Sequence, residues 1–133
     1  MKGAIEHKQE DSQQSVTYRV LGRHYLFELY GCAEKFLVDI EVLKKSMISA
    51  AETAGATVVN SVFHGYSPQG LSGVVVISES HLTVHTWPEL NYAAVDVFTC
   101  GEGNLGEDIG QALIRTFEAS EYHSREIDRG ISI

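Results

Sequence analysis

Basic residues are scarce in this chain. Its 133 residues include ten lysines and arginines against eighteen aspartates and glutamates, which gives a formal net charge of -8 at neutral pH. Nucleic acids and anionic membrane surfaces are bound through clustered basic side chains. The composition therefore argues against both as partners, and it is compatible with a cationic small molecule.

Long apolar runs are absent as well. No segment approaches the roughly 18 to 20 apolar residues that a membrane span needs, and the polar opening segment lacks the apolar core of a signal peptide. We therefore expect a cytoplasmic protein that does not enter a membrane. Residues 1–17 are predicted to form a polar, disordered arm, and residues 18–133 a single domain.

Cysteine is also rare. The two cysteines, Cys32 and Cys100, are far apart and form neither a CxxC nor a zinc-ribbon pattern. In the reducing compartment expected here, both should be free thiols. A Gly-x-Ser-x-Gly nucleophile elbow is missing around Ser80, which stands between Glu79 and His81. This absence argues against a serine hydrolase of that type.

The hydrophobic pattern predicts a βαββ unit followed by a ββαβ unit. Strand-like alternation covers Arg19–Tyr30, and apolar residues at helical spacing run from Asp39, the predicted N-cap, to Gly55. A second helix is predicted with Ile109, Leu113 and Phe117 on one face. Further strands are predicted over residues 56–66, 71–78, 92–99 and 122–128, and the stretch of residues 77–89 is expected to extend the same sheet.

This order lacks the regular strand-helix alternation of doubly wound folds. We therefore predict an α+β protomer, with a mainly antiparallel sheet and both helices on one face. The other face of such a sheet needs a cover, and the pairing of two sheets in a dimer would supply one.

One predicted strand region is unusually polar. The stretch ISESHLTVHTWPE, residues 77–89, holds two serines, two histidines and two glutamates. His81 and His85 would share a face of a strand but lie about 13 Å apart, too far to bind one metal ion, so no metal is expected. Ser80 follows one strand-like run and precedes another. If the chain is bent at that break, its hydroxyl could attack the preceding carbonyl.

Several segments together carry a resemblance to a known family: GLSGVVVISESHLTVHTWPE, LGRHYLFELYGC, YAAVDVFTCG and DRGI. From about Leu21 onward the chain resembles the small bacterial and archaeal S-adenosylmethionine decarboxylases. The resemblance implies an αββα sandwich formed by a homodimer. It also implies a proenzyme that cuts itself between Glu79 and Ser80, into residues 1–79 and 80–133, with Ser80 becoming a covalent pyruvoyl group.

The resemblance also implies a role for each matching residue. Ser80 would attack the Glu79 carbonyl, and the pyruvoyl group made from it would form a Schiff base with the substrate, so that no pyridoxal phosphate is needed. His85 would be the proton acceptor of processing, Ser72 would assist it, and Cys100 would return a proton to the substrate. The product would be decarboxylated S-adenosylmethionine, the aminopropyl donor of spermidine synthesis.

The resemblance extends to substrate binding, where the chain departs from the family pattern at some positions. Glu89 matches a family glutamate that could accept hydrogen bonds from the ribose hydroxyls, and Tyr66 stands where a stacking phenylalanine is usual. Gly65 replaces a basic residue of many relatives, and Leu71 replaces a valine. Because these departures fall in or beside the predicted substrate loop, a pyruvoyl-dependent arginine or ornithine decarboxylase remains open. A non-catalytic interaction protein is a more remote alternative.

Overall fold

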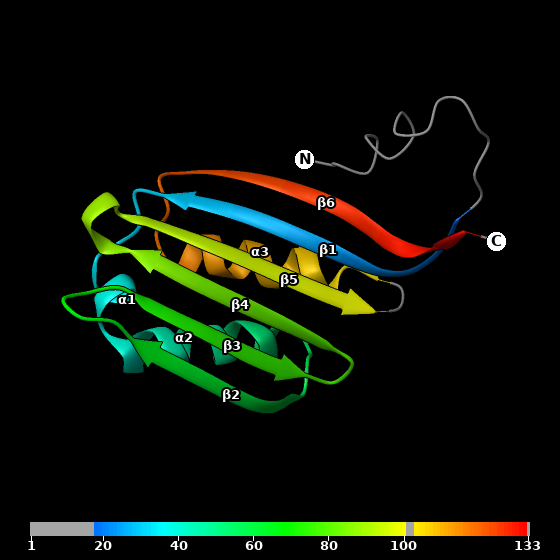
Figure 1. Ribbon diagram of the computed structural model, residues 1–133, viewed down its shortest axis with the longest axis horizontal. Helices are drawn as coiled ribbons and strands as arrows, with labels where there is room; N and C mark the ends of the chain where they lie inside the picture. The colour runs from blue at the N-terminus through cyan, green and yellow to red at the C-terminus, as the bar shows by residue number, and fades with distance from the viewer. Residues whose placement is uncertain (1–17, 101–102, 133) are drawn as a thin grey trace.

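The computed structural model describes residues 18–100 and 103–132. Within these ranges the chain forms a six-stranded sheet in the order β2-β3-β4-β5-β1-β6, and every neighbouring pair is antiparallel (Figure 1). The arm predicted over residues 1–17 lies outside the described residues. The strands are β1 Tyr18–Tyr30, β2 Val58–Gly65, β3 Leu71–Ile77, β4 Ser80–Trp87, β5 Tyr92–Cys100 and β6 Glu121–Ser132.

The helices lie together on one face of the sheet (Figure 1). The predicted pair is present as α2, Ile40–Thr53, and α3, Leu105–Thr116. The Asp39 carboxylate caps α2, as predicted, by accepting hydrogen bonds from the backbone N–H groups of Glu41 and Val42. Two short elements were not predicted: α1, Lys35–Val38, and the 3₁₀ turn η2, Pro88–Leu90. Neither is long enough to show a helical period.

The hydrophobic core fills the space between the helices and the sheet. Strand alternation decides which side chains enter it, so that Leu82, Val84 and Thr86 of β4 are buried while His85 and Trp87 are exposed. We call the opposite face of the sheet the open face, because no described element covers it (Figure 1). By the same alternation it carries His24, Glu28, Tyr30, Val62, Ser72, Val74, Val76, His81, Thr83, His85, Trp87, Tyr92, Asp96 and Phe98.

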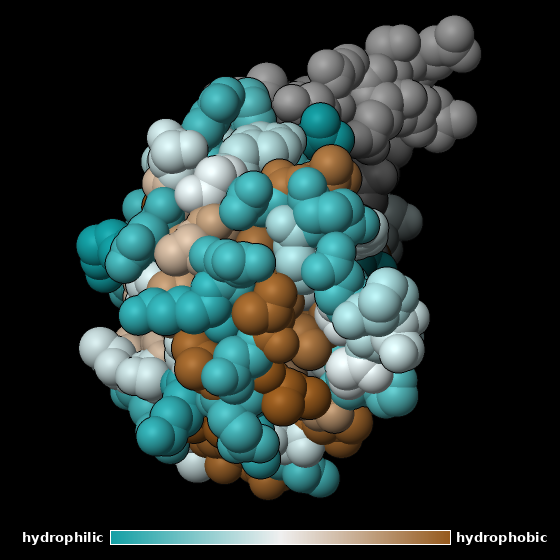
Figure 2. Space-filling view, turned by 90° about the vertical axis from the view of Figure 1, so that its left-hand side faces the viewer, coloured by the Kyte–Doolittle hydropathy of each residue, from teal (hydrophilic) through white to brown (hydrophobic). Residues whose placement is uncertain are grey.

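One end of the molecule combines α1, η2 and the loop between β2 and β3 (Figure 1). Hydrophobic groups gather among hydrophilic ones on this end (Figure 2), and the exposed hydrophobic residues of its elements include Val38 and Leu90. Among the described residues, no helix is long and apolar enough to cross a membrane.

Candidate active site

The chain bends sharply just before Ser80. Strand β3 ends at Ile77 and β4 begins at Ser80, so that Ser78 and Glu79 form a two-residue turn. Glu79 has a φ of 61°. The favoured two-residue hairpin turns place a positive φ at the first residue or at both, whereas here only the second has one. This left-handed conformation costs a non-glycine residue roughly 1–2 kcal/mol, so the Glu79–Ser80 peptide bond begins at a strained residue.

Cys100 lies beside Ser80 at the end of β5. Its backbone N–H donates a hydrogen bond to the Ser80 Oγ over 3.3 Å. Both cysteines are free thiols, as predicted, but they differ in environment: Cys100 is exposed and Cys32 is buried. Burial raises the pKa of the Cys32 thiol to about 11. Cys100 is therefore the accessible thiol, and it adjoins the residue that follows the strained turn.

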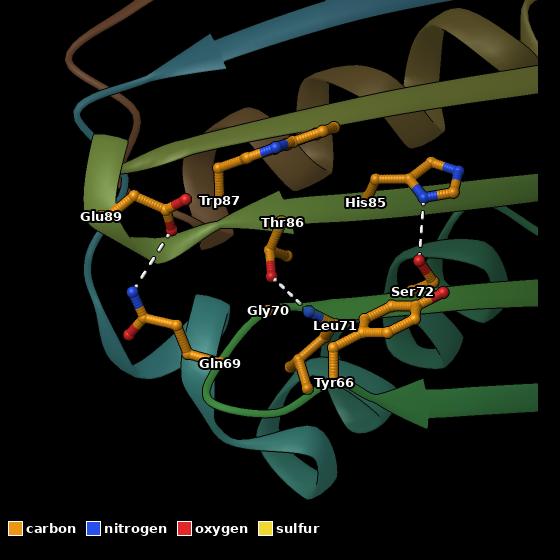
Figure 3. Close-up of a pocket in the computed structure, with 9 residues that line it drawn as sticks. All are labelled: Tyr66, Gln69, Gly70, Leu71, Ser72, His85, Thr86, Trp87 and Glu89. Carbon is orange, nitrogen blue, oxygen red and sulfur yellow. Dashed lines mark hydrogen bonds between the residues drawn. The ribbon is translucent and has the colours of Figure 1, made fainter.

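Ser72 and His85 form a second pair at the other end of the same hairpin. The register of β3 and β4 places them opposite each other, and the Ser72 Oγ is hydrogen-bonded to the His85 Nδ1 at 2.8 Å (Figure 3). Which of the two donates depends on the histidine tautomer. A neutral imidazole that donates from Nε2 would accept the serine proton at Nδ1, which leaves the pair able to exchange a proton.

A cavity of about 340 Å³ adjoins this second pair. Both predicted substrate-binding residues, Tyr66 and Glu89, line it together with Ser72 and His85 (Figure 3). Five further residues line the cavity and were not predicted as site residues: Gln69, Gly70, Leu71, Thr86 and Trp87. Trp87 could have been found from the strand period, because it shares the face of His85. Gln69 lies in the predicted substrate loop, but no motif singled out its side chain there.

The two pairs are not brought together within one chain. Ser80 and His85 are five residues apart on β4, which corresponds to about 16 Å along a strand, and an odd spacing puts their side chains on opposite faces. Ser72 lies with His85 and Cys100 with Ser80. The structure thus groups the predicted catalytic residues as two pairs at opposite ends of β4.

Other polar contacts on the open face were not predicted. Asp96 accepts a hydrogen bond from the Thr83 hydroxyl and is paired with the His24 Nε2 at 2.8 Å. The Tyr92 hydroxyl donates to the Glu28 carboxylate. Burial, followed by the contact with that carboxylate, raises the pKa of Tyr92 to about 12. Among the described residues, no group of three or more histidines, cysteines, aspartates and glutamates could hold a metal ion.

Comparisons with known proteins give the family. A family model described as S-adenosylmethionine decarboxylase matches residues 23–130. The chain is 55% identical to the S-adenosylmethionine decarboxylase proenzyme of Moorella thermoacetica over 113 residues, which cover 85% of this chain and 90% of the relative. The proenzyme of Pelotomaculum thermopropionicum is 56% identical over 111 residues, 84% of this chain and 88% of the relative. The chain belongs to the S-adenosylmethionine decarboxylase family.

A solved structure supports the same assignment. The crystal structure of the adenosylmethionine decarboxylase from Aquifex aeolicus matches with a TM-score of 0.79 and 30% identity, and the match covers 85% of this chain and 93% of that chain. The predicted family and α+β fold are therefore confirmed, as is the class of enzyme, a decarboxylase of the kind made as a proenzyme. The arginine, ornithine and non-catalytic alternatives receive no support from these matches.

Proposed function

We propose that this chain decarboxylates S-adenosylmethionine in the cytoplasm, with a pyruvoyl group that it makes from its own Ser80. The observation that carries the proposal is the turn before that residue. Glu79, in a left-handed conformation, precedes a serine whose hydroxyl is held by the backbone of Cys100. Cleavage at this bond would give fragments of residues 1–79 and 80–133.

The residues present suit the chemistry of making that group. The Ser80 Oγ attacks the Glu79 carbonyl carbon, the peptide C–N bond breaks, and the Ser80 nitrogen takes the proton, which leaves an ester. A base then removes the Ser80 α-proton, and the bond from Cβ to Oγ breaks to release the Glu79 carboxylate. Water replaces the nitrogen of the resulting dehydroalanine, and ammonia leaves. No external oxidant is required.

His85 is the base that we propose for the α-proton, and the distance along β4 requires it to come from a second copy of the chain. In the proposed dimer, two protomers pair through their open faces about a two-fold axis near the middle of β4. The end of β4 that carries His85 would then lie opposite the end that carries Ser80 in the partner. The Ser72–His85 pair of one protomer would then approach Ser80 of its partner from the open side. Exposed hydrophobic residues on this face suit such a homodimer: Tyr30, Val62, Val74, Val76 and Trp87.

In the mature enzyme the pyruvoyl group supplies a ketone and an adjacent carbonyl that draw electrons away from the substrate as carbon dioxide leaves. No pyridoxal phosphate or metal ion is required for this chemistry. Cys100, an exposed free thiol, would return a proton to the substrate α-carbon. Glu89 would accept hydrogen bonds from the ribose hydroxyls and Tyr66 would stack on the adenine. The cavity between them would take the nucleoside.

A co-expression experiment tests the cleavage and the dimer together. We expect the wild-type chain to split into two fragments on a denaturing gel, and both Ser80→Ala and His85→Ala to stay intact when expressed alone. When the two variants are expressed together with different tags, the His85→Ala chain should split, because its Ser80 meets the wild-type His85 of the partner. The Ser80→Ala chain should remain whole.

The outcomes separate the parts of the proposal. A wild-type chain that never splits would refute self-processing. Failure of the mixed variants to cleave, in a preparation shown by mass measurement to contain mixed dimers, would refute the contribution in trans. Release of carbon dioxide from S-adenosylmethionine, but not from arginine or ornithine, is the expected result for the substrate, and the reverse pattern would contradict it.

A further inference from the structure

We propose that Gln69 is a positioning residue that orients the Glu89 carboxylate toward the ribose of the substrate. The Gln69 Nε2 donates a hydrogen bond to the Glu89 Oε1 over 3.3 Å, between a loop and a turn that are twenty residues apart in sequence (Figure 3). Both side chains line the cavity beside Ser72 and His85. The inference rests on the proposed function, because it assigns Gln69 a role in the same binding site.

The backbone around Gln69 is held at both ends of its loop. The Tyr66 N–H donates to the Gly70 carbonyl over 2.8 Å, which closes the loop on itself. The Leu71 N–H donates to the Thr86 Oγ1 over 2.9 Å, and that hydroxyl donates in turn to the Leu37 carbonyl over 2.9 Å. Thr86 is only 6% exposed. The loop is therefore held to β4 and α1 through a buried hydroxyl. These hydrogen bonds restrain the backbone from which the Gln69 side chain extends.

The contact leaves Glu89 able to bind a diol. An ionised carboxylate offers about four lone-pair positions on its two oxygens. Gln69 occupies one position on Oε1, which leaves Oε2 and the rest of Oε1 for donors in the cavity. Two neighbouring hydroxyl groups, such as those of a ribose, match these free positions. An amide donor at Oε1 selects one orientation of the carboxylate before the substrate arrives.

A neutral donor also preserves the charge of the site. Among the described residues that line this cavity, Glu89 is the one carboxylate, and there is no lysine or arginine. A lysine or arginine in place of Gln69 would hold the carboxylate but cancel its attraction for a cationic substrate. The sulfonium of S-adenosylmethionine carries such a charge. Gln69 thus combines orientation with an undiminished negative potential, which suits a positively charged nucleoside.

The test compares isosteric loss of the donor with a matched control. Gln69→Met keeps the length of the side chain and removes the N–H, whereas Gln111→Met makes the same exchange on α3, away from this cavity. With fully cleaved enzyme we expect Gln69→Met to raise KM for S-adenosylmethionine about fivefold with kcat within about twofold, and Gln111→Met to change neither.

A double-mutant comparison and a substrate-analogue comparison distinguish orientation of Glu89 from a general effect on the loop. The KM increase should disappear in a Glu89→Gln background, and it should also disappear with the 2′-deoxy analogue of S-adenosylmethionine, which lacks one partner hydroxyl. An unchanged KM in Gln69→Met would overturn the inference. An increase that persists in both the Glu89→Gln background and the analogue would overturn it as well. If the wild-type enzyme neither splits nor releases carbon dioxide, the proposed function itself fails. If the wild type is active and Gln69→Met leaves KM unchanged, only the role of Gln69 is refuted.

Discussion

Strain at Glu79 should contribute to the rate of self-cleavage, and the substitution Glu79→Gly tests this directly. The residue has a φ of 61°, a conformation that costs a non-glycine residue roughly 1–2 kcal/mol and glycine almost nothing. Relief of this strain would stabilise the folded chain, but glycine also stabilises the unfolded chain by about 0.4–1 kcal/mol through its greater conformational freedom. We therefore expect the folded proenzyme to be stabilised by about 0.5–1 kcal/mol.

The chain offers a matched control for this change. Glu118, between α3 and β6, has a φ of 56° and is also a glutamate in the left-handed region. In an uncleavable Ser80→Ala background, Glu79→Gly and Glu118→Gly should each raise Tm by about 2–4 °C in a thermal melt followed by circular dichroism. Similar shifts would show that both positions store comparable backbone strain.

Only the substitution at the turn should change cleavage. If strain of about 1 kcal/mol at Glu79 is released as the Ser80 hydroxyl attacks, Glu79→Gly will slow the appearance of the two fragments about fivefold. Glu118→Gly should cleave at the wild-type rate, and so should Glu79→Gln, which removes the charge but keeps the strained backbone. The measurement is a time course on a denaturing gel after synthesis. Cleavage of Glu79→Gly at the wild-type rate, despite a raised Tm, would refute the role of strain.

Two further predictions concern the thiols and the pH dependence of stability. Iodoacetamide at pH 8 should alkylate Cys100 and spare Cys32 in the native Ser80→Ala chain, because Cys32 is buried with a pKa raised to about 11; peptide mass analysis that finds Cys32 modified first would contradict this. The pKa of Tyr92 is raised to about 12 from an ordinary value of 10.0, so as the pH rises the unfolded chain loses the hydroxyl proton before the folded chain does. The contribution of the protonated Tyr92 to the free energy of unfolding is therefore complete below about pH 10 and is lost between about pH 10 and 12. Urea unfolding across this range should show a shallower loss of stability for Tyr92→Phe than for the wild type, and equal slopes would count against the assignment.

Much of the fold was readable from local patterns. The apolar positions of α2 and α3 recur at helical spacing, Asp39 caps α2, and the alternation in β4 separates buried Leu82 and Val84 from exposed His85. These features depend on residues close together in the chain. The helix α1 and the turn η2 escaped prediction, because three or four residues are too few to show a period.

Part of the site was also within reach of the sequence. A two-residue turn at Ser78 and Glu79 pairs Ile77 with Ser80, and counting outward along the hairpin places Ser72 opposite His85. The contact of Ser80 with Cys100 could not be counted in this way. It depends on the register between β4 and β5, which a 3₁₀ turn with a left-handed Asn91 sets.

The sequence by itself determined the strands, the two long helices and the buried side of β4, because side-chain period and capping motifs are properties of neighbouring residues. The tertiary structure alone decided the strand order, in which β1 inserts between β5 and β6, and the contact of Gln69 with Glu89. It also decided that Ser80 with Cys100 and Ser72 with His85 stand at opposite ends of β4. Such arrangements follow from long-range packing and strand register, which hydrophobic periodicity does not specify.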